Sequence, residues 1–158
     1  MTSLADYPIS PVDLPVSYRF LVVFFALGVI PNPLDIRFQK VSGLSLEVNT
    51  RIQREGGENI FSTVLPEQVS HGNLILERGA VIGSPLNLEF NAALNFYKFS
   101  VSNVLVSLLD ANYIPTAGWL FLKAYPVKWS VSDLNGESNS LVIDTLELAY
   151  QRFQILRI

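Results

Sequence analysis

The stretch Asp144–Phe153 reads DTLELAYQRF. Apolar side chains stand at its even positions Leu146, Leu148 and Tyr150, with small or polar residues between them. Successive side chains of a β-strand point to opposite faces, so this alternation predicts a strand with one buried and one wet face. Such a strand could close a small barrel, line a pocket or face a water-filled channel.

The composition around this stretch favours a β-rich domain. A chain of 158 residues fits one domain with a real core, and this one is rich in Phe, Tyr and β-branched residues. The net charge of −3 gives no support to a specific nucleic-acid site. The absence of cysteine excludes disulfides, a thiolate metal site and a Cys nucleophile.

The most apolar run, Phe20–Pro31, reads FLVVFFALGVIP. It is too short to cross a bilayer as a helix, which takes about 20 residues. The residues before it hold several prolines and no positive charge ahead of Arg19, unlike a secretory leader. We therefore expect no membrane anchor here, and a buried strand covered on both faces.

The rest of the chain also reads as strands, with a single helix. Ser84 is a candidate N-cap, Pro85 fits the first helical position, and Leu86, Phe90 and Ala93 recur at helical spacing. The predicted elements are a Pro-rich leader (1–17), then a single domain (18–158) with strands at 18–27, 35–41, 73–81, 100–110, 119–130 and 141–155, a hairpin at about 44–65 and a helix at 85–96. The expected fold class is mainly β: a small antiparallel barrel or sandwich with one flanking helix and a long projecting hairpin.

The hairpin is the feature that most needs an explanation. Its strands surround a polar tip in which paired glycines can take positive φ at little cost. A lone two-stranded ribbon is marginal in water, so it should rest on its own barrel or on another molecule. The tip residues are Arg54, Glu55, Gly56, Gly57, Glu58 and Asn59.

The sequence offers little catalytic chemistry. The single histidine, His71, lies in the polar stretch SHGN and reads as a surface residue rather than a general base. Gly83-Ser84-Pro85 lacks the pattern of a nucleophile elbow and reads as a helix start. No acidic spacing resembles a calcium loop or a two-metal site. We expect neither an enzyme nor a bound cofactor.

Four stretches together resemble a known family. They are EGGEN (Glu55–Asn59), LERG (Leu76–Gly79) followed by Ser84-Pro85-Leu86, AYPVKWS (Ala124–Ser130) and IDTLELAYQRF (Ile143–Phe153). In this order and spacing the region from Tyr18 to Phe153 is similar to the tube proteins of contractile phage tails and of extracellular phage-tail-like injection particles.

This resemblance implies a fold and a mechanical role. Six copies would form a ring whose inner surface is a continuous sheet around a channel, and rings would stack into a tube inside a contractile sheath. The Arg54–Asn59 tip would belong to an arm that reaches a neighbouring subunit or ring, and DTLELAYQRF to the barrel. Implied partners are further copies, adjacent tube rings, spike and baseplate proteins, and sheath components. The particle would assemble in the bacterial cytoplasm as part of a phage tail or of a released injection particle.

Two departures from the plainer main-tube pattern refine this expectation. The chain has the leader Met1–Ser17 and an expanded first turn at Ala26–Leu34. Both favour the baseplate-proximal tube initiator, which must meet different partners above and below. One alternative is the main tube subunit, with either DNA or a protein effector in its lumen. Another is a small-ligand-binding β-barrel carrier, although a carrier gains nothing from a long polar arm.

Overall fold

A computed structural model describes residues 19–25, 37–57, 60–80 and 83–157, so the leader and the expanded first turn lie outside it. The elements in chain order are β1 (Phe20–Phe25), β2 (Lys40–Ser42), β3 (Leu46–Gln53), β4 (Thr63–His71), β5 (Leu74–Gly79), α1 (Pro85–Phe96), β6 (Ser102–Leu109), β7 (Pro115–Val131), β8 (Ile143–Ala149) and β9 (Arg152–Arg157). The described part of the chain is mainly β with one helix, and all its strand pairings are antiparallel, as predicted.

The body is a sandwich of two sheet halves that share the long strand β7. The first half of β7 pairs with β6 and β9, and β6 pairs in turn with β1. The second half of β7 pairs with β8, followed by β5 and β2. Among the described strands no pairing joins β1 to β2, so the body takes the sandwich form of the prediction and does not close into a barrel.

The chain bends at one corner to pass between the two halves. At Lys123 the backbone of β7 takes a φ of 54°, and its amide donates to Asn103 Oδ1 at 3.1 Å. Beside it, the amide of Gln151 donates to the carbonyl of Leu122 at 3.1 Å. The single strand predicted over Leu141–Ile155 is therefore wrong: β8 ends at Ala149, and β9 begins at Arg152 in the other half-sheet.

The core fills the space between the half-sheets and the helix. The even positions of the opening stretch are buried, with Leu146 at 0%, Leu148 at 1% and Tyr150 at 5% exposure. They join one cluster with residues from the other strands and from α1: Val22, Leu74, Leu76, Leu86, Phe90, Val104, Val106, Phe121 and Ala124. Alternation in DTLELAYQRF thus places one face of this strand in the core of its own chain.

The helix begins and ends where its sequence signals predict. Ser84 has an extended backbone, its side chain accepts a hydrogen bond from the amide of Asn87, and Pro85 follows at the first helical position. Leu86, Phe90 and Ala93 form the buried face of the helix.

Glycine is required where β2 ends. Gly43 has a φ of 87°, and a Cβ atom there would lie 2.0 Å from the carbonyl oxygen of Asn73. The end of β2 at Ser42 therefore has a steric cause in the residue that follows it. The strand before it is shorter than the predicted 35–41, since β2 begins at Lys40.

Strand β1 is less buried than the sequence predicts. Val22 is fully buried, but Phe25 remains 41% exposed, and the strand pairs only with β6 among the described strands. The sequence predicts a strand covered on both faces, yet within the described residues only Val22 of this strand is fully buried.

Candidate functional site: the projecting arm

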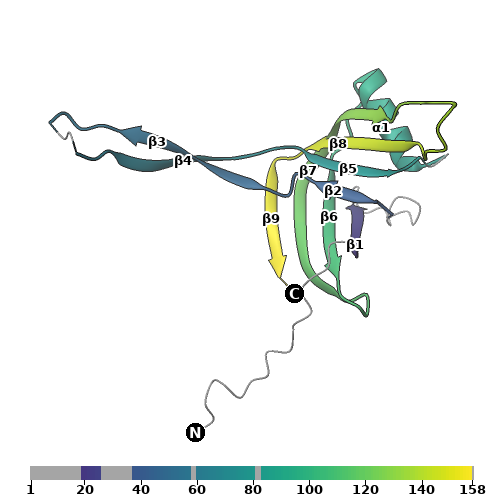
Figure 1. The fold of residues 1–158 in the computed structure, drawn as a ribbon, viewed down its shortest axis with the longest axis horizontal. Helices are drawn as coiled ribbons and strands as arrows, with labels where there is room; N and C mark the ends of the chain where they lie inside the picture. The colour runs from purple at the N-terminus through teal and green to yellow at the C-terminus, as the bar shows by residue number, and fades with distance from the viewer. Residues whose placement is uncertain (1–18, 26–36, 58–59, 81–82, 158) are drawn as a thin grey trace, which may run out of the picture.

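Strands β3 and β4 form a separate two-stranded sheet that projects from the body as a long arm (Figure 1). Almost every residue of both strands is exposed. The hairpin extends beyond its predicted range of 44–65, because its second strand, β4, continues to His71. The register shifts between Val48 and Thr50, a bulge that bends and twists the ribbon.

The arm is amphipathic, and its apolar face has no covering layer in the described chain. Val48 lies opposite Val69, and Ile52 lies opposite Val64, so four apolar side chains line one face. They are between 51% and 60% exposed. The other face is mainly polar, although Leu65 lies on it opposite Arg51. There Glu47 lies opposite Ser70, whose hydroxyl donates to Asn49 Oδ1 at 3.4 Å. Ribbons of this kind normally rest on another surface.

The root of the arm is packed onto the body. The ring of His71 stacks on that of Tyr150, with centroids 4.1 Å apart and planes at 14°. Tyr150 contacts Phe121 edge-on at 4.8 Å, and burial raises the pKa of its hydroxyl above the ordinary value. His71 is thus at the surface, as predicted, but it ends a strand and supports the arm instead of standing in a loop.

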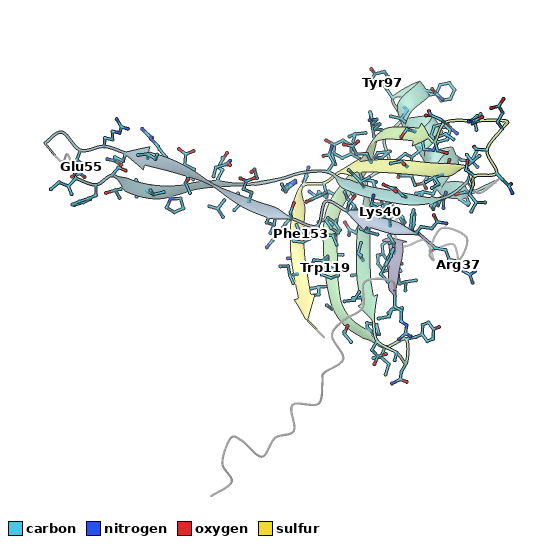
Figure 2. All side chains as sticks on the ribbon, in the orientation of Figure 1. Arg37, Lys40, Glu55, Tyr97, Trp119 and Phe153 are labelled. Atoms are coloured by element: carbon cyan, nitrogen blue, oxygen red, sulfur yellow. The ribbon has the colours of Figure 1, made fainter. Side chains whose placement is uncertain are left out.

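The predicted tip residues lie at the far end of the arm. Arg54, Glu55, Gly56 and Gly57 are exposed, and Gly57 has the positive φ expected of the turn, at 107°. Figure 2 shows Glu55 at this end, well away from the body. Glu58 and Asn59 lie outside the described residues. The described part of the tip is therefore exposed at the end of the arm, and its contact with a neighbour stays a prediction.

A buried polar cluster fixes the helix to the sheet, and the sequence reading missed it. Arg78 is 1% exposed, and its guanidinium donates to Ser84 Oγ at 2.6 Å and to Asn87 Oδ1 at 2.8 Å. The side-chain amide of Asn87 donates to the buried Asp144 at 3.3 Å. The alternating pattern of LERG and DTLEL does place Arg78 and Asp144 on the buried face, which is the signal that could have revealed the cluster.

Both edges of one half-sheet are free within the described chain. Strand β1 pairs only with β6, and β9 pairs only with β7, so the half-sheet β1-β6-β7-β9 is open at both sides. An open edge presents unpaired amides and carbonyls to another chain. Among the described residues no group of three or more His, Asp or Glu could hold a metal ion, and no helix is long and apolar enough to cross a membrane.

Comparison with known proteins identifies the arrangement of arm, helix and sandwich. The family model of the T4-like virus tail tube protein gp19 matches residues 16–154. The chain belongs to this tail tube family. A search of curated proteins finds no match.

Solved structures agree with the family. A chain of the cryo-EM structure of the anti-feeding prophage baseplate, 6-fold symmetrised, is 45% identical, with a TM-score of 0.83 over 90% of this chain and 95% of its own. A chain of the PVC extracellular contractile injection system, in its extended sheath–tube complex, shares the fold at 21% identity, with a TM-score of 0.75 over the whole of both chains. A chain of the anti-feeding prophage cap shares it at 23% identity, with a TM-score of 0.74 over 96% of this chain and 99% of its own. The protein is a tail-tube-like component of contractile injection systems.

Proposed function

We propose that this chain forms the ring that joins the baseplate spike to the main tube of a contractile injection particle. The observation that supports this most directly is the contrast in identity among the similar structures. The chain is 45% identical to a chain of a baseplate and 21% identical to one from a sheath–tube complex, although it covers nearly all of both. A subunit of the repeating tube would be expected to show the opposite order.

The ring itself is supported by the surfaces that the single chain leaves open. The free edges of β1 and β9 can pair between copies, which would continue the half-sheet around a channel and remove its edges. The apolar face of the arm needs a partner surface, and the arm with its tip at Arg54–Asn59 would reach one on a neighbouring copy. Six copies are proposed because the baseplate structure with the similar chain is 6-fold symmetrised.

The remaining partners follow from this position in the particle. Spike and baseplate proteins would lie on one side of the ring, and the first ring of the main tube on the other. The surrounding sheath or baseplate components would contact its outer side. The role is mechanical and needs no cofactor, and we propose assembly in the bacterial cytoplasm before release of the particle.

Copy number per particle tests the proposal. Quantitative mass spectrometry of purified particles should find this chain at about six copies, a fixed number in particles of different length. Electron microscopy of the isolated chain should find six-fold rings, and light scattering should give them about six times the chain mass of 17.6 kDa. A copy number that rises with tube length would contradict the initiator role and favour the main tube subunit, the second candidate. A chain that stays monomeric at high concentration would contradict both.

A further inference from the structure

An apolar groove lies at the opposite end of the body from the arm. It runs between α1 and the corner where β1, β6 and β7 meet, with a volume of about 1010 Å³. Phe25, Leu88, Phe99 and Val101 line it, and Lys98 and Lys123 add two ammonium groups. The groove joins segments that are far apart in the sequence, which explains why no local pattern predicts it.

The groove has the properties of an interface that is open in the single chain. Leu88 is 67% exposed, and Phe99 and Val101 are each nearly half exposed. The buried face of α1 uses Leu86 and Phe90, so Leu88 points away from the core on the other side of the helix. A cluster of large exposed apolar side chains of this kind marks a contact surface.

The arm complements the groove in apolarity and in charge. Its uncovered face presents Val48, Ile52, Val64 and Val69, which need an apolar surface to rest on. The segment 46–71 holds four glutamates and two arginines, a net charge of −2 with His71 neutral. The two lysines of the groove outnumber its one carboxylate, Glu89. An acidic apolar ribbon and a basic apolar groove are complementary.

The two surfaces cannot meet within one chain. Figure 1 shows the arm leaving the body on the side away from α1, and Figure 2 shows Glu55 and Tyr97 at opposite ends of the molecule. A contact between the two ends of identical chains is heterologous, and such contacts close into rings when the rotation allows. We propose that the apolar face of the arm of one copy lies in the α1 groove of a second copy. This rests on the proposed ring function and names the surface that receives the arm.

Cysteine cross-linking tests the proposal, because the chain has no native cysteine. Ile52→Cys or Val64→Cys is made in one preparation of the full-length chain, and Leu88→Cys in another. The two are mixed under mild oxidation and resolved by non-reducing electrophoresis. We expect a disulfide-linked dimer of one arm variant with the groove variant. The matched control is Arg51→Cys, the neighbour of Ile52 on the polar face, which should not link to Leu88→Cys.

A second variant tests the same contact without oxidation. Leu88→Glu places a carboxylate in the groove at a highly exposed position, so the monomer should melt like wild type. We expect the concentration for half assembly to rise by about tenfold or more, as for loss of a central interface residue.

The outcomes separate the two proposals. Rings without the arm-to-groove link, or equal linking by Arg51→Cys, would overturn the groove as receiver and leave the ring function standing. Failure of Leu88→Cys to react with a small maleimide in dilute monomer would mean that a segment of the same chain already fills the groove, which also overturns the inference. Absence of rings in every preparation would overturn both.

Discussion

At the scale of single residues, Arg78 in the buried polar cluster is the clearest case of a side chain whose loss should destabilise the fold. Replacing Arg78 by Met removes two hydrogen bonds to the start of α1 and leaves the buried Asp144 without its cationic neighbour across the strand pair. We expect R78M to lower the free energy of unfolding by about 3–5 kcal/mol, as for breaking a buried charged network. The control is K40M, since Lys40 pairs with Glu77 at 3.1 Å but is 62% exposed, and it should cost about 1 kcal/mol or less. Urea unfolding measures both, and equal losses would show that the cluster adds nothing beyond a surface pair.

At the same scale, the buried hydroxyl of Tyr150 predicts how the stability of the fold changes with pH. Burial raises the pKa of its hydroxyl above 10.0 in the folded chain, whereas the unfolded chain ionises near that value. Above about pH 10 the unfolded state therefore binds fewer protons than the folded one, and this group makes stability fall as pH rises. Tyr150→Phe keeps the ring against His71 and removes the ionisation. Compared by urea unfolding at about pH 8 and about pH 10.5, Y150F should lose less stability than wild type. Tyr113→Phe, at a position 75% exposed, should lose as much as wild type. An equal loss in Y150F and wild type would be evidence against the prediction.

At the scale of elements, the arm should be separable from the stability of the body. Deleting Arg54–Ile60 shortens the turn between β3 and β4 and removes the proposed contact with a neighbour. Because β3 and β4 pair only with each other and add no residue to the core cluster, the thermal transition of the body should stay within a few degrees. Ring assembly, followed by size-exclusion chromatography and electron microscopy, should be lost. The matched control deletes Asn135–Ser138 from the exposed turn between β7 and β8 and should still assemble. Rings formed by the arm deletion would contradict the assembly role of the tip.

The elements also show what local sequence can and cannot predict. The bounds of α1 were predictable because Ser84, Pro85 and the helical spacing act within a few residues of one another. The break between β8 and β9 was not, since alternation continues through Tyr150 and the corner depends on the backbone of Lys123 in another strand. For the candidate site, the paired glycines Gly56-Gly57 predicted the turn of a long hairpin with a polar tip. The groove that could receive the arm could not be predicted from the sequence, because Phe25, Leu88 and Val101 meet only in the folded chain.

At the scale of the whole molecule, the described residues leave three kinds of surface without a partner: the apolar face of the ribbon, the apolar groove and the two open edges of one half-sheet. In an antiparallel edge strand about half of the amides point outward and lack a partner until another strand arrives. If rings close by pairing β1 of one copy with β9 of the next, these amides become hydrogen-bonded only in the assembly. Hydrogen exchange of dilute monomer and of concentrated rings should therefore show slower exchange in peptides from β1 and β9. The internal control is β6, which is paired on both sides in the monomer and should change little. Protection confined to the arm and α1, with β1 and β9 unchanged, would mean that the arm-to-groove contact alone holds the ring and that its inner sheet is interrupted at every subunit boundary.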